Sequence, residues 1–557
     1  MNVRPGPKRS MWPHPTRTQK LAWLLVVLVM LVVILRDYDS HPAILIDSSR
    51  YVVLAQSLLQ SPTYGLINGV GAPGQAQYPF GYPFVLAPVV ALFPGNFEAL
   101  RVPSTLATLL NAALLFWGWP LLSRRSYWWG LVITALCCLS PITVLQARLV
   151  LSEAVFLTWL LLVILLAEWG AHRSPAWWWF LAQGTAATMM VFTRTVGWVM
   201  WAGIVIYWLY RKRTHAFGEL LLLAAVMVGV TALIVTVTAV APADVVPNAY
   251  ARQSSVLIRG ERVVSGSEPE PYSAFLKRTL PRRVSQDLPA AVIPALNSNY
   301  VGTLARQWGI WPLLLSLGVL TTLIMALGLV RWWVRDGPSA FLLAALPYLG
   351  LLMAWTWTDR RFLYPIQAQM FYAFLIGLEG CGFGLVRFSR RPQTRRFLKP
   401  ALMAVIALML ALFAAVSLAY PDNRVYSRMQ HERGQWFRQH TQVTDVIMSS
   451  RPQIDYLFTG HRTVDLTDAL DFHAPEEFAS YLEQQHVRYL IAESERETWA
   501  LDPTSGLPAR ELIDRGQAHT TLDLVLALAA QGRLALVYTG EQEAFQVFAV
   551  VPSAPGD

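Results

Sequence analysis

The sequence contains few charged residues and few cysteines. Only 14% of its 557 residues are Asp, Glu, Lys or Arg, whereas about 25% is usual in soluble globular domains. The three cysteines, Cys137, Cys138 and Cys381, all lie within apolar runs, where a thiol behaves as a small hydrophobic group. These shortages exclude an ordinary soluble fold and argue against a disulfide framework or a thiolate metal site.

Long apolar runs, in contrast, recur along the first three quarters of the chain, which is 54% hydrophobic overall. Each run approaches the roughly 20 residues that a helix needs to cross a bilayer. We therefore predict an α-helical polytopic membrane protein with about 11 transmembrane helices. The predicted spans are 21–35, 101–122, 127–145, 151–169, 176–193, 196–210, 218–240, 308–331, 339–357, 362–386 and 400–420.

Basic residues gather in every second connection between these spans, for example at Arg124, Arg125 and Arg211. Positive charge stays on the cytoplasmic side of membrane proteins, so we predict a cytoplasmic N-terminus and an extracytoplasmic C-terminus. This placement accounts for the net charge of +10 without nucleic-acid binding. The first span lacks a following small-residue cleavage site, which favours a retained helix over a signal peptide. The expected location is the cell membrane, inner or plasma, in a multi-pass arrangement.

Strand-like runs at 445–448 and 487–491 alternate with helical stretches at 476–485 and 522–531. This alternation predicts a small extracytoplasmic α/β domain at the C-terminus. The predicted organisation is a cytoplasmic segment 1–20, a transmembrane module 21–420 with outer loops 36–100 and 241–305, and a soluble domain 421–557.

The first outer loop contains a helix-like segment that opens with an acidic residue. Asp47, Arg50, Tyr51 and Leu54 follow at i, i+3, i+4 and i+7, which is one face of a helix. On spacing alone, Asp47 either caps this helix or has a function, because carboxylates favour helix N-termini. The loop continues as NGVGAPGQAQYPFGYPFVLAP, residues 68–88, whose Gly and Pro content predicts irregular backbone where the chain returns to the membrane.

A second acidic residue, Glu153, stands at the predicted outer end of the fourth span. Its position directly after Ser152 is typical of an ordinary helix start. A functional reading is an equal alternative, with Arg148 as the candidate partner of the carboxylate.

Arginines also occur in two short outer turns, in spite of the positive-inside bias. Arg194 lies between the fifth and sixth spans, and Arg360 and Arg361 lie between the ninth and tenth. Such positions predict anion binding at the outer leaflet. An ion pair with Asp359 is the alternative explanation for the second turn.

Polar groups therefore gather at the outer ends of the predicted spans, while the middles stay apolar. A transporter would place polar groups and broken helices near the midplane. The pattern favours chemistry on the outer face with a substrate that lies in the membrane. A transporter or flippase for a lipid-linked or polyanionic substrate, and a non-catalytic scaffold, remain as alternatives.

Four segments resemble the GT-C superfamily of integral-membrane glycosyltransferases, in particular the branch with protein mannosyltransferases and aminoarabinose transferases. They are IDSSRYVVLAQSLLQ, YPFGYPFVLAP, ARLVLSEAVFL and DRRFLYPIQ, in this order and within residues 20–390. The sequence departs from some members at Gln77 and Tyr78, where a Lys precedes the Pro-rich segment, and at Glu153, where many members have Asp.

The resemblance implies a GT-C-like fold and an inverting transfer of a sugar from a polyprenyl-phosphate donor to a glycan, glycolipid or protein acceptor at the outer face. It implies Asp47 as general base, a role for which we expect burial to raise its pKa from about 3.9. Glu153 would position the acceptor or share the base's role, and Arg194, Arg360 and Arg361 would bind the donor phosphate. Further substrate-site candidates are Arg50, Tyr51, Arg148, Tyr82 and Tyr364.

No cofactor is expected. A divalent metal held by Asp37, Asp39, Asp47 and Glu153 is an alternative that we do not favour. The sugar, the acceptor and the role of the C-terminal domain stay open at this point.

Overall fold

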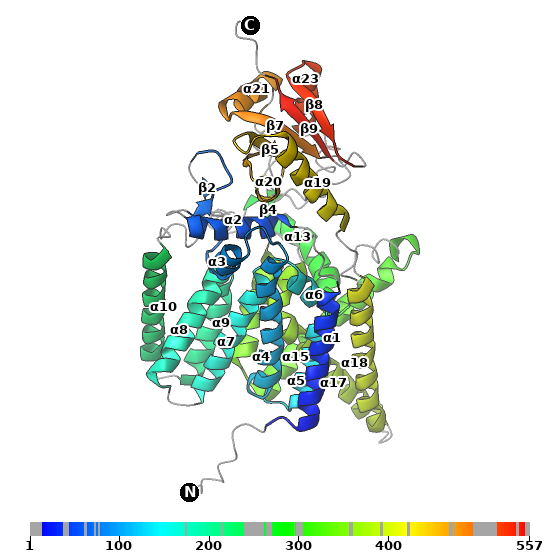
Figure 1. Cartoon of the computed structure of the whole chain (residues 1–557). Helices are drawn as coiled ribbons and strands as arrows, with labels where there is room; N and C mark the ends of the chain where they lie inside the picture. Colours follow the sequence, from blue (N-terminus) through cyan, green and yellow to red (C-terminus); the bar gives the residue numbers. More distant parts are fainter. Residues whose placement is uncertain are drawn as a thin grey trace.

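The computed structural model shows a bundle of helices with a small mixed α/β unit standing on one end (Figure 1). It describes residues 14–36, 44–60, 64–71, 74–75, 78–172, 175–212, 216–238, 261–262, 270–293, 296, 305–355, 360–389, 394–419, 424–466, 472, 474–493, 521–541 and 545–551. Most of the predicted outer loop 241–305 before residue 270 lies outside this part of the chain.

The bundle helices follow the predicted spans. They are α1 (Arg17–Leu35), α4 (Val102–Ser123), α5 (Tyr127–Leu139), α6 (Pro141–Arg148), α7 (Glu153–Ala171), α8 (Trp177–Thr193), α9 (Gly197–Lys212), α10 (Ala216–Thr238), α15 (Trp311–Asp336), α16 (Ala340–Ala354), α17 (Gln367–Ser389) and α18 (Thr394–Ala419). The first begins before the predicted residue 21 because Thr16 and Gln19 form a capping box at its N-terminus.

Among the described residues, six helices are each long and apolar enough to cross a membrane, and the bent pair α5–α6 makes seven. The chain is thus a multi-pass membrane protein. Every predicted span coincides with a helix, while the count of eleven crossings stays a prediction because α8, α9, α16 and α17 do not meet the same length and composition limits.

The third predicted span, 127–145, is broken into two helices that meet at an angle of 60°. Ser140 has extended backbone between them, and Pro141 opens α6. Proline lacks the N–H that would continue the helix through this point but is well tolerated at the first helical position, so it ends α5 and starts α6.

Hydrogen bonds between the segments that connect the helices show which helix ends lie together. The Arg124 guanidinium donates to the carbonyl of Asp336 at 2.8 Å, so the α4–α5 and α15–α16 connections meet. Arg211, at the end of α9, lies 2.9 Å from a ring nitrogen of His172, at the end of α7. These basic connections lie at the end of the bundle where α1 begins (Figure 1).

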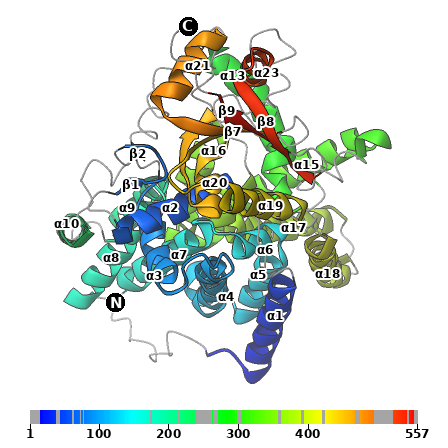
Figure 2. The ribbon, with the colours of Figure 1, turned by 45° about the horizontal axis from the view of Figure 1, so that its top comes forward.

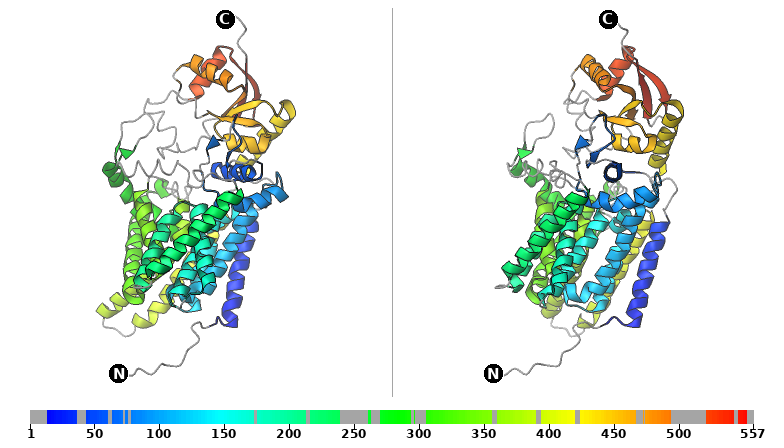
Figure 3. Two further views of the ribbon diagram at one scale, coloured as in Figure 1. Left: turned by 90° about the vertical axis from the view of Figure 1, so that its left-hand side faces the viewer. Right: turned by 60° about the vertical axis from the view of Figure 1, so that its left-hand side comes forward.

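A layer of short elements covers the other end of the bundle, which we call the α2 end. Helix α2 (Ile46–Gln60) lies across the tops of the bundle helices (Figure 3). Around it are the hairpin β1 (Gly65–Leu66) and β2 (Gly74–Gln75), helix α3 (Gly81–Leu92) and the single turn η1 (Ala99–Arg101). The 3-10 turn η6 (Arg360–Ile366) joins the same layer through its contacts with α7.

The expectation of irregular backbone over 68–88 is wrong for residues 81–88, which are helical in α3. Pro83 is the third residue of this helix, where the backbone N–H has no intrahelical partner to lose. A Cβ on Gly81 would come within 2.7 Å of the backbone of Phe192 and Thr193, so glycine lets α3 approach the end of α8 closely.

Three further elements follow α10 along the chain: the short pair β3 (Glu261–Arg262) and β4 (Glu270–Pro271), and the helix α13 (Tyr272–Arg282). The turns η3 (Arg283–Asp287) and η4 (Pro289–Ala291) come directly afterwards. Of the basic residues in this stretch, Arg283 is buried and donates to the carbonyl of Trp355.

The C-terminal part is built on a five-stranded sheet with strand order β6-β5-β7-β9-β8. Strand β5 pairs in parallel with β6 and β7, while β9 is antiparallel to β7 and β8. The predicted strands at 445–448 and 487–491 and the predicted helices at 476–485 and 522–531 are confirmed as elements. The elements of this C-terminal part are α19 (Arg424–His440), β5 (Val446–Ser449), α20 (Pro452–Thr459), β6 (Arg462–Asp465), α21 (Pro475–Gln484), β7 (Val487–Glu493), α23 (Thr521–Ala530), β8 (Leu534–Thr539) and β9 (Phe545–Val550).

Candidate active site

Four charged residues from four elements come together at the α2 end of the bundle. Asp47 comes from α2, Glu153 from the start of α7, Arg194 from the end of α8, and Arg361 from η6. These residues, which we call the site cluster, alternate in charge along a chain of ion pairs. They lie far apart in the sequence, so only the packing of the helices brings them together.

Asp47 lies at the open side of this cluster. An Nη1 atom of Arg361 lies 2.5 Å from its Oδ2, and the hydroxyl of Tyr78 donates to its Oδ1 at 2.7 Å. Arg50, one turn further along α2, donates to the same Tyr78 oxygen at 3.4 Å. Asp47 and Arg50 thus lie on one face of α2, as predicted. The Asp47 carboxylate contacts Arg361 and Tyr78 from other parts of the chain.

The expected rise in the pKa of Asp47 is wrong for this structure. Burial does act to raise it, but the charge of Arg361, the Tyr78 hydroxyl and the charge of Arg50 together hold the pKa of Asp47 below its ordinary value. The carboxylate is therefore ionised at neutral pH and is a weaker base while Arg361 stays beside it.

Glu153 forms the buried floor of the site cluster, with its side chain 1% exposed. Its Oε1 lies 2.5 Å from Nη1 of Arg194 and 3.7 Å from Nε of Arg361. It is also the first residue of α7, where a carboxylate interacts favourably with the helix dipole. Arg194, rather than the predicted Arg148, is the close ion-pair partner.

Ser152 does not cap α7 through its side chain. Its hydroxyl lies 2.9 Å from the hydroxyl of Tyr51 and accepts a hydrogen bond from Arg194 at 3.2 Å. The serine therefore links α2 to the arginine of the site cluster.

The ring of Phe362 lies close to both arginines. The guanidinium carbons of Arg194 and Arg361 lie 5.6 Å and 5.5 Å from the ring centroid of Phe362. Tyr348 holds this turn by donating to the Phe362 carbonyl at 2.7 Å. Such cation–π contacts help to keep two like charges close together.

The other substrate-site candidates occupy different positions. Tyr51 is buried and packs against Tyr78 in a tilted arrangement and against Tyr82 edge to face, at 4.8 Å and 4.9 Å between ring centroids. Tyr82 is fully buried and its hydroxyl lies 2.9 Å from that of Ser104, which holds the ring that Tyr51 packs against. Arg148 donates to the Val33 carbonyl of α1.

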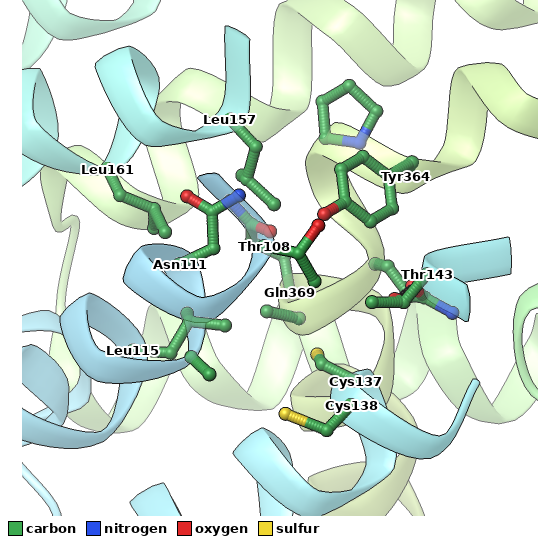
Figure 4. Close-up of a pocket in the computed structure, with 14 residues that line it drawn as sticks. Thr108, Asn111, Leu115, Cys137, Cys138, Thr143, Leu157, Leu161, Tyr364 and Gln369 are labelled. Carbon is green, nitrogen blue, oxygen red and sulfur yellow. Dashed lines mark hydrogen bonds between the residues drawn. The ribbon is translucent and has the colours of Figure 1, made fainter. Parts of the chain in front are cut away.

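Tyr364 lines a small, mostly apolar pocket inside the bundle (Figure 4). It lies there beside Thr108 and Asn111, with Cys137 and Cys138 further along the same wall. None of the four residues of the site cluster lines this pocket. The structure therefore separates Tyr364 from the charged residues that the sequence grouped with it.

Three predicted participants lie outside what the structure describes. Asp37 and Asp39 are outside the described residues, and so is the side chain of Arg360, whose backbone starts η6. Within the described part of the chain, no group of three or more His, Cys, Asp or Glu gathers that could hold a metal ion. Because the carboxylates of Asp47 and Glu153 are each paired with arginine, we derive no step through a metal.

Sequence reasoning missed the parts played by Tyr78, Ser152 and Phe362. Tyr78 was considered only as the residue that stands in place of a lysine, yet its hydroxyl bonds the Asp47 carboxylate. The available signal was its place at the start of the Pro-rich segment, which returns the chain to the site.

Comparison with known proteins gives relatives by structure alone. No protein-family model and no curated protein matches the sequence. The structure is similar to that of the Archaeoglobus fulgidus oligosaccharyltransferase in complex with Zn and sulfate, with a TM-score of 0.55, 14% identity, and coverage of 95% of this chain and 73% of that one. The oligosaccharyltransferase AglB from the same organism, in complex with an inhibitory peptide and a dolichol-phosphate, gives a TM-score of 0.51, 13% identity and coverage of 96% and 74%.

A further similar structure is ArnT from Cupriavidus metallidurans bound to undecaprenyl phosphate, with a TM-score of 0.49, 15% identity and coverage of 97% and 99%. The fold assignment rests on the first two. The chain has a GT-C-like fold, and the predicted fold type is confirmed.

Proposed function

We propose that the protein is a glycosyltransferase that moves a sugar from a polyprenyl-phosphate-linked donor to an acceptor at the outer face of the membrane, with inversion. The observation that carries this proposal is the site cluster at the end of a membrane bundle, in which the partly exposed Asp47 carboxylate pairs with Arg361, and the buried Glu153 pairs with both Arg361 and Arg194. The fold, which solved glycosyltransferases share, adds support.

In the proposed reaction, the acceptor hydroxyl attacks the anomeric carbon of the donor sugar. The bond between that carbon and the phosphate oxygen breaks, and the Asp47 carboxylate takes the hydroxyl proton. The leaving polyprenyl phosphate gains one negative charge, which Arg194 and Arg361 stabilise. Guanidinium has five N–H donors, so an arginine held by Glu153 can also bond a phosphate.

Because Asp47 is paired with Arg361, we expect the donor to bind before Asp47 can act as the base. A donor phosphate competes with Asp47 for Arg361, and its arrival weakens the contact that lowers the pKa of Asp47. Donor binding therefore prepares the base. Glu153, which forms ion pairs with both arginines, keeps them in place during the exchange.

The test is a transfer assay with the purified full chain and a polyprenyl-phosphate sugar. Asp47→Asn keeps the size of the side chain and removes the base, so we expect a loss of about 10²- to 10⁴-fold in kcat. Asp336→Asn is the matched control, because Asp336 forms a 2.5 Å ion pair with Arg335 at the opposite end of the bundle. Transfer by Asp47→Asn at the wild-type rate would overturn the assignment of the base.

A further inference from the structure

The C-terminal sheet unit contacts the loop that carries Asp47 at three places. Helix α20 packs against both α2 and α19 (Figure 2), and α2 lies between α20 and the bundle (Figure 3). The two segments are far apart in the sequence, so these are long-range tertiary contacts.

The first contact is a pair of hydrogen bonds from one side chain to one residue. Gln430 of α19, which is fully buried, donates through Nε2 to the Ile44 carbonyl at 2.9 Å and accepts from the Ile44 N–H at 3.0 Å through Oε1. A primary amide is a side chain that can donate and accept in this forked way. Both hydrogen-bonding groups of Ile44 are thereby fixed three residues before Asp47.

The second contact lies on the far side of α2. The Thr463 N–H in β6 donates to the Asn68 carbonyl at 2.7 Å, and the Asn68 amide donates to the Thr463 hydroxyl at 2.9 Å. Because β6 is an edge strand, this contact also covers part of its open edge. The two polar contacts therefore bracket α2 along the chain.

The third contact is apolar. Ile44 is 1% exposed and packs with Ile454 and Phe458 of α20 in a small core of their own. The ring of Phe97, which follows α3, lies 4.7 Å from the ring of Phe458. This core seals Gln430 and Ile44 from water, so hydrogen bonds lost there are not replaced by water.

We propose that Gln430 is a positioning residue for Asp47, and that the C-terminal sheet unit is part of the catalytic scaffold. This inference rests on the proposed function of Asp47. The site cluster needs α2 at a fixed height above Glu153 and Arg361, and Gln430 holds the residues that start α2. A displacement of about 1 Å far from the reacting atoms can cost about 10²-fold in rate.

The test compares two glutamines of the same helix in the full chain. Gln430→Met keeps the length of the side chain and removes both hydrogen bonds, whereas Gln435→Met changes an exposed position of α19. For Gln430→Met we expect kcat to fall about 10- to 100-fold with an unchanged KM for the donor, because Arg194 and Arg361 belong to other elements. For Gln435→Met we expect wild-type values.

Hydrogen–deuterium exchange on the same samples separates this inference from the proposed function. We expect faster exchange over residues 44–50 in Gln430→Met and no change in Gln435→Met, whether or not the chain transfers sugar. Wild-type kcat, or unchanged exchange over 44–50, would overturn the positioning role. An equal loss of kcat and donor affinity together with a lower Tm would also overturn it, because that result marks a general structural defect.

Discussion

The site cluster and a second cluster, in the C-terminal unit, each contain two acidic residues and two arginines, but their side chains differ in solvent exposure. In the C-terminal unit, Arg433 lies 2.8 Å from Asp455 and 2.9 Å from Glu493, and Arg451 lies 3.3 Å from Glu493. We call these four residues the tail cluster. No side chain in it is more than 9% exposed.

The site cluster has the same composition but is open on one side. Glu153 is 1% exposed, whereas Asp47 and Arg361 are 21% and 25% exposed. An ion pair that is closed on all sides can only hold a structure together, while an open one can exchange a partner for a ligand. The difference in exposure, and not in residue type, separates the two clusters.

The pKa values of the two aspartates, Asp455 in the tail cluster and Asp47 in the site cluster, shift in opposite directions. Burial raises the pKa of Asp455 in spite of Arg433 and the Ser449 hydroxyl, whereas Arg433 and Arg451 outweigh burial and lower the pKa of Glu493. The pKa of Asp47 is instead lowered, since Arg361 and Tyr78 outweigh its burial. An aspartate with a lowered pKa stabilises the fold above its unfolded pKa, and this contribution is lost as the pH falls through the folded value.

The largest effect on stability is expected from opening the tail cluster. Arg433→Met leaves Asp455 and Glu493 buried without their central cation, which typically costs about 3–5 kcal/mol. Thermal or denaturant unfolding of the purified chain measures this loss. Arg428→Met, at an exposed position of the same helix, is the control and should unfold as the wild type does. Equal stability of the two variants would show that the closed cluster is dispensable.

In the site cluster, Arg361→Met should affect transfer rather than stability. Loss of a cation that stabilises the leaving phosphate is expected to lower kcat/KM about 10²- to 10³-fold. Donor titrations should show weaker donor use with little change in acceptor use. Arg335→Met, which breaks the matched pair with Asp336 at the opposite end, should retain activity. Similar losses in both variants would contradict a role in phosphate binding.

The same variant tests the electrostatics of Asp47. Without Arg361, the main group that lowers the pKa of Asp47 is gone, so the pKa rises. The acid limb of the kcat/KM profile, which reports the free enzyme, should therefore move to higher pH. A limb that stays in place would show that another group limits the rate at low pH.

The smallest effect is expected from Tyr78→Phe. This change removes one hydrogen bond to the Asp47 carboxylate and keeps the ring that packs against Tyr51. We expect a loss of about 2- to 10-fold in kcat. Tyr538→Phe is the control, because its hydroxyl bonds the carboxylate of Glu432 at 2.6 Å in the C-terminal unit. A loss in Tyr78→Phe as large as that in Asp47→Asn would call for a direct role of the phenol.

Much of the arrangement follows from the sequence. Apolar runs located the helices of the bundle, and the order of charged residues at their ends selected Asp47, Glu153, Arg194 and Arg361, which the structure brings together. This succeeds because helix length and bilayer thickness fix which residues share one end of the bundle.

Pairings between distant segments could not be predicted in this way. Periodicity says which face of a helix is buried but not which side chain it meets, so Arg148 was taken as a partner of Glu153 although it reaches α1. Gln430 and Ile44 are 386 residues apart, and neither belongs to a motif. The sign of the pKa shift of Asp47 depends on Arg361 and Tyr78 at once, and so it also required the structure.

The most direct test is a cryo-EM structure of the full chain with a polyprenyl phosphate. We predict phosphate density in the site cluster, within hydrogen-bonding distance of Arg194 and Arg361, with Asp47 released from Arg361 and still bonded by Tyr78. Phosphate bound away from these arginines, with the pair between Asp47 and Arg361 intact, would contradict the assignment of this cluster as the transferase site.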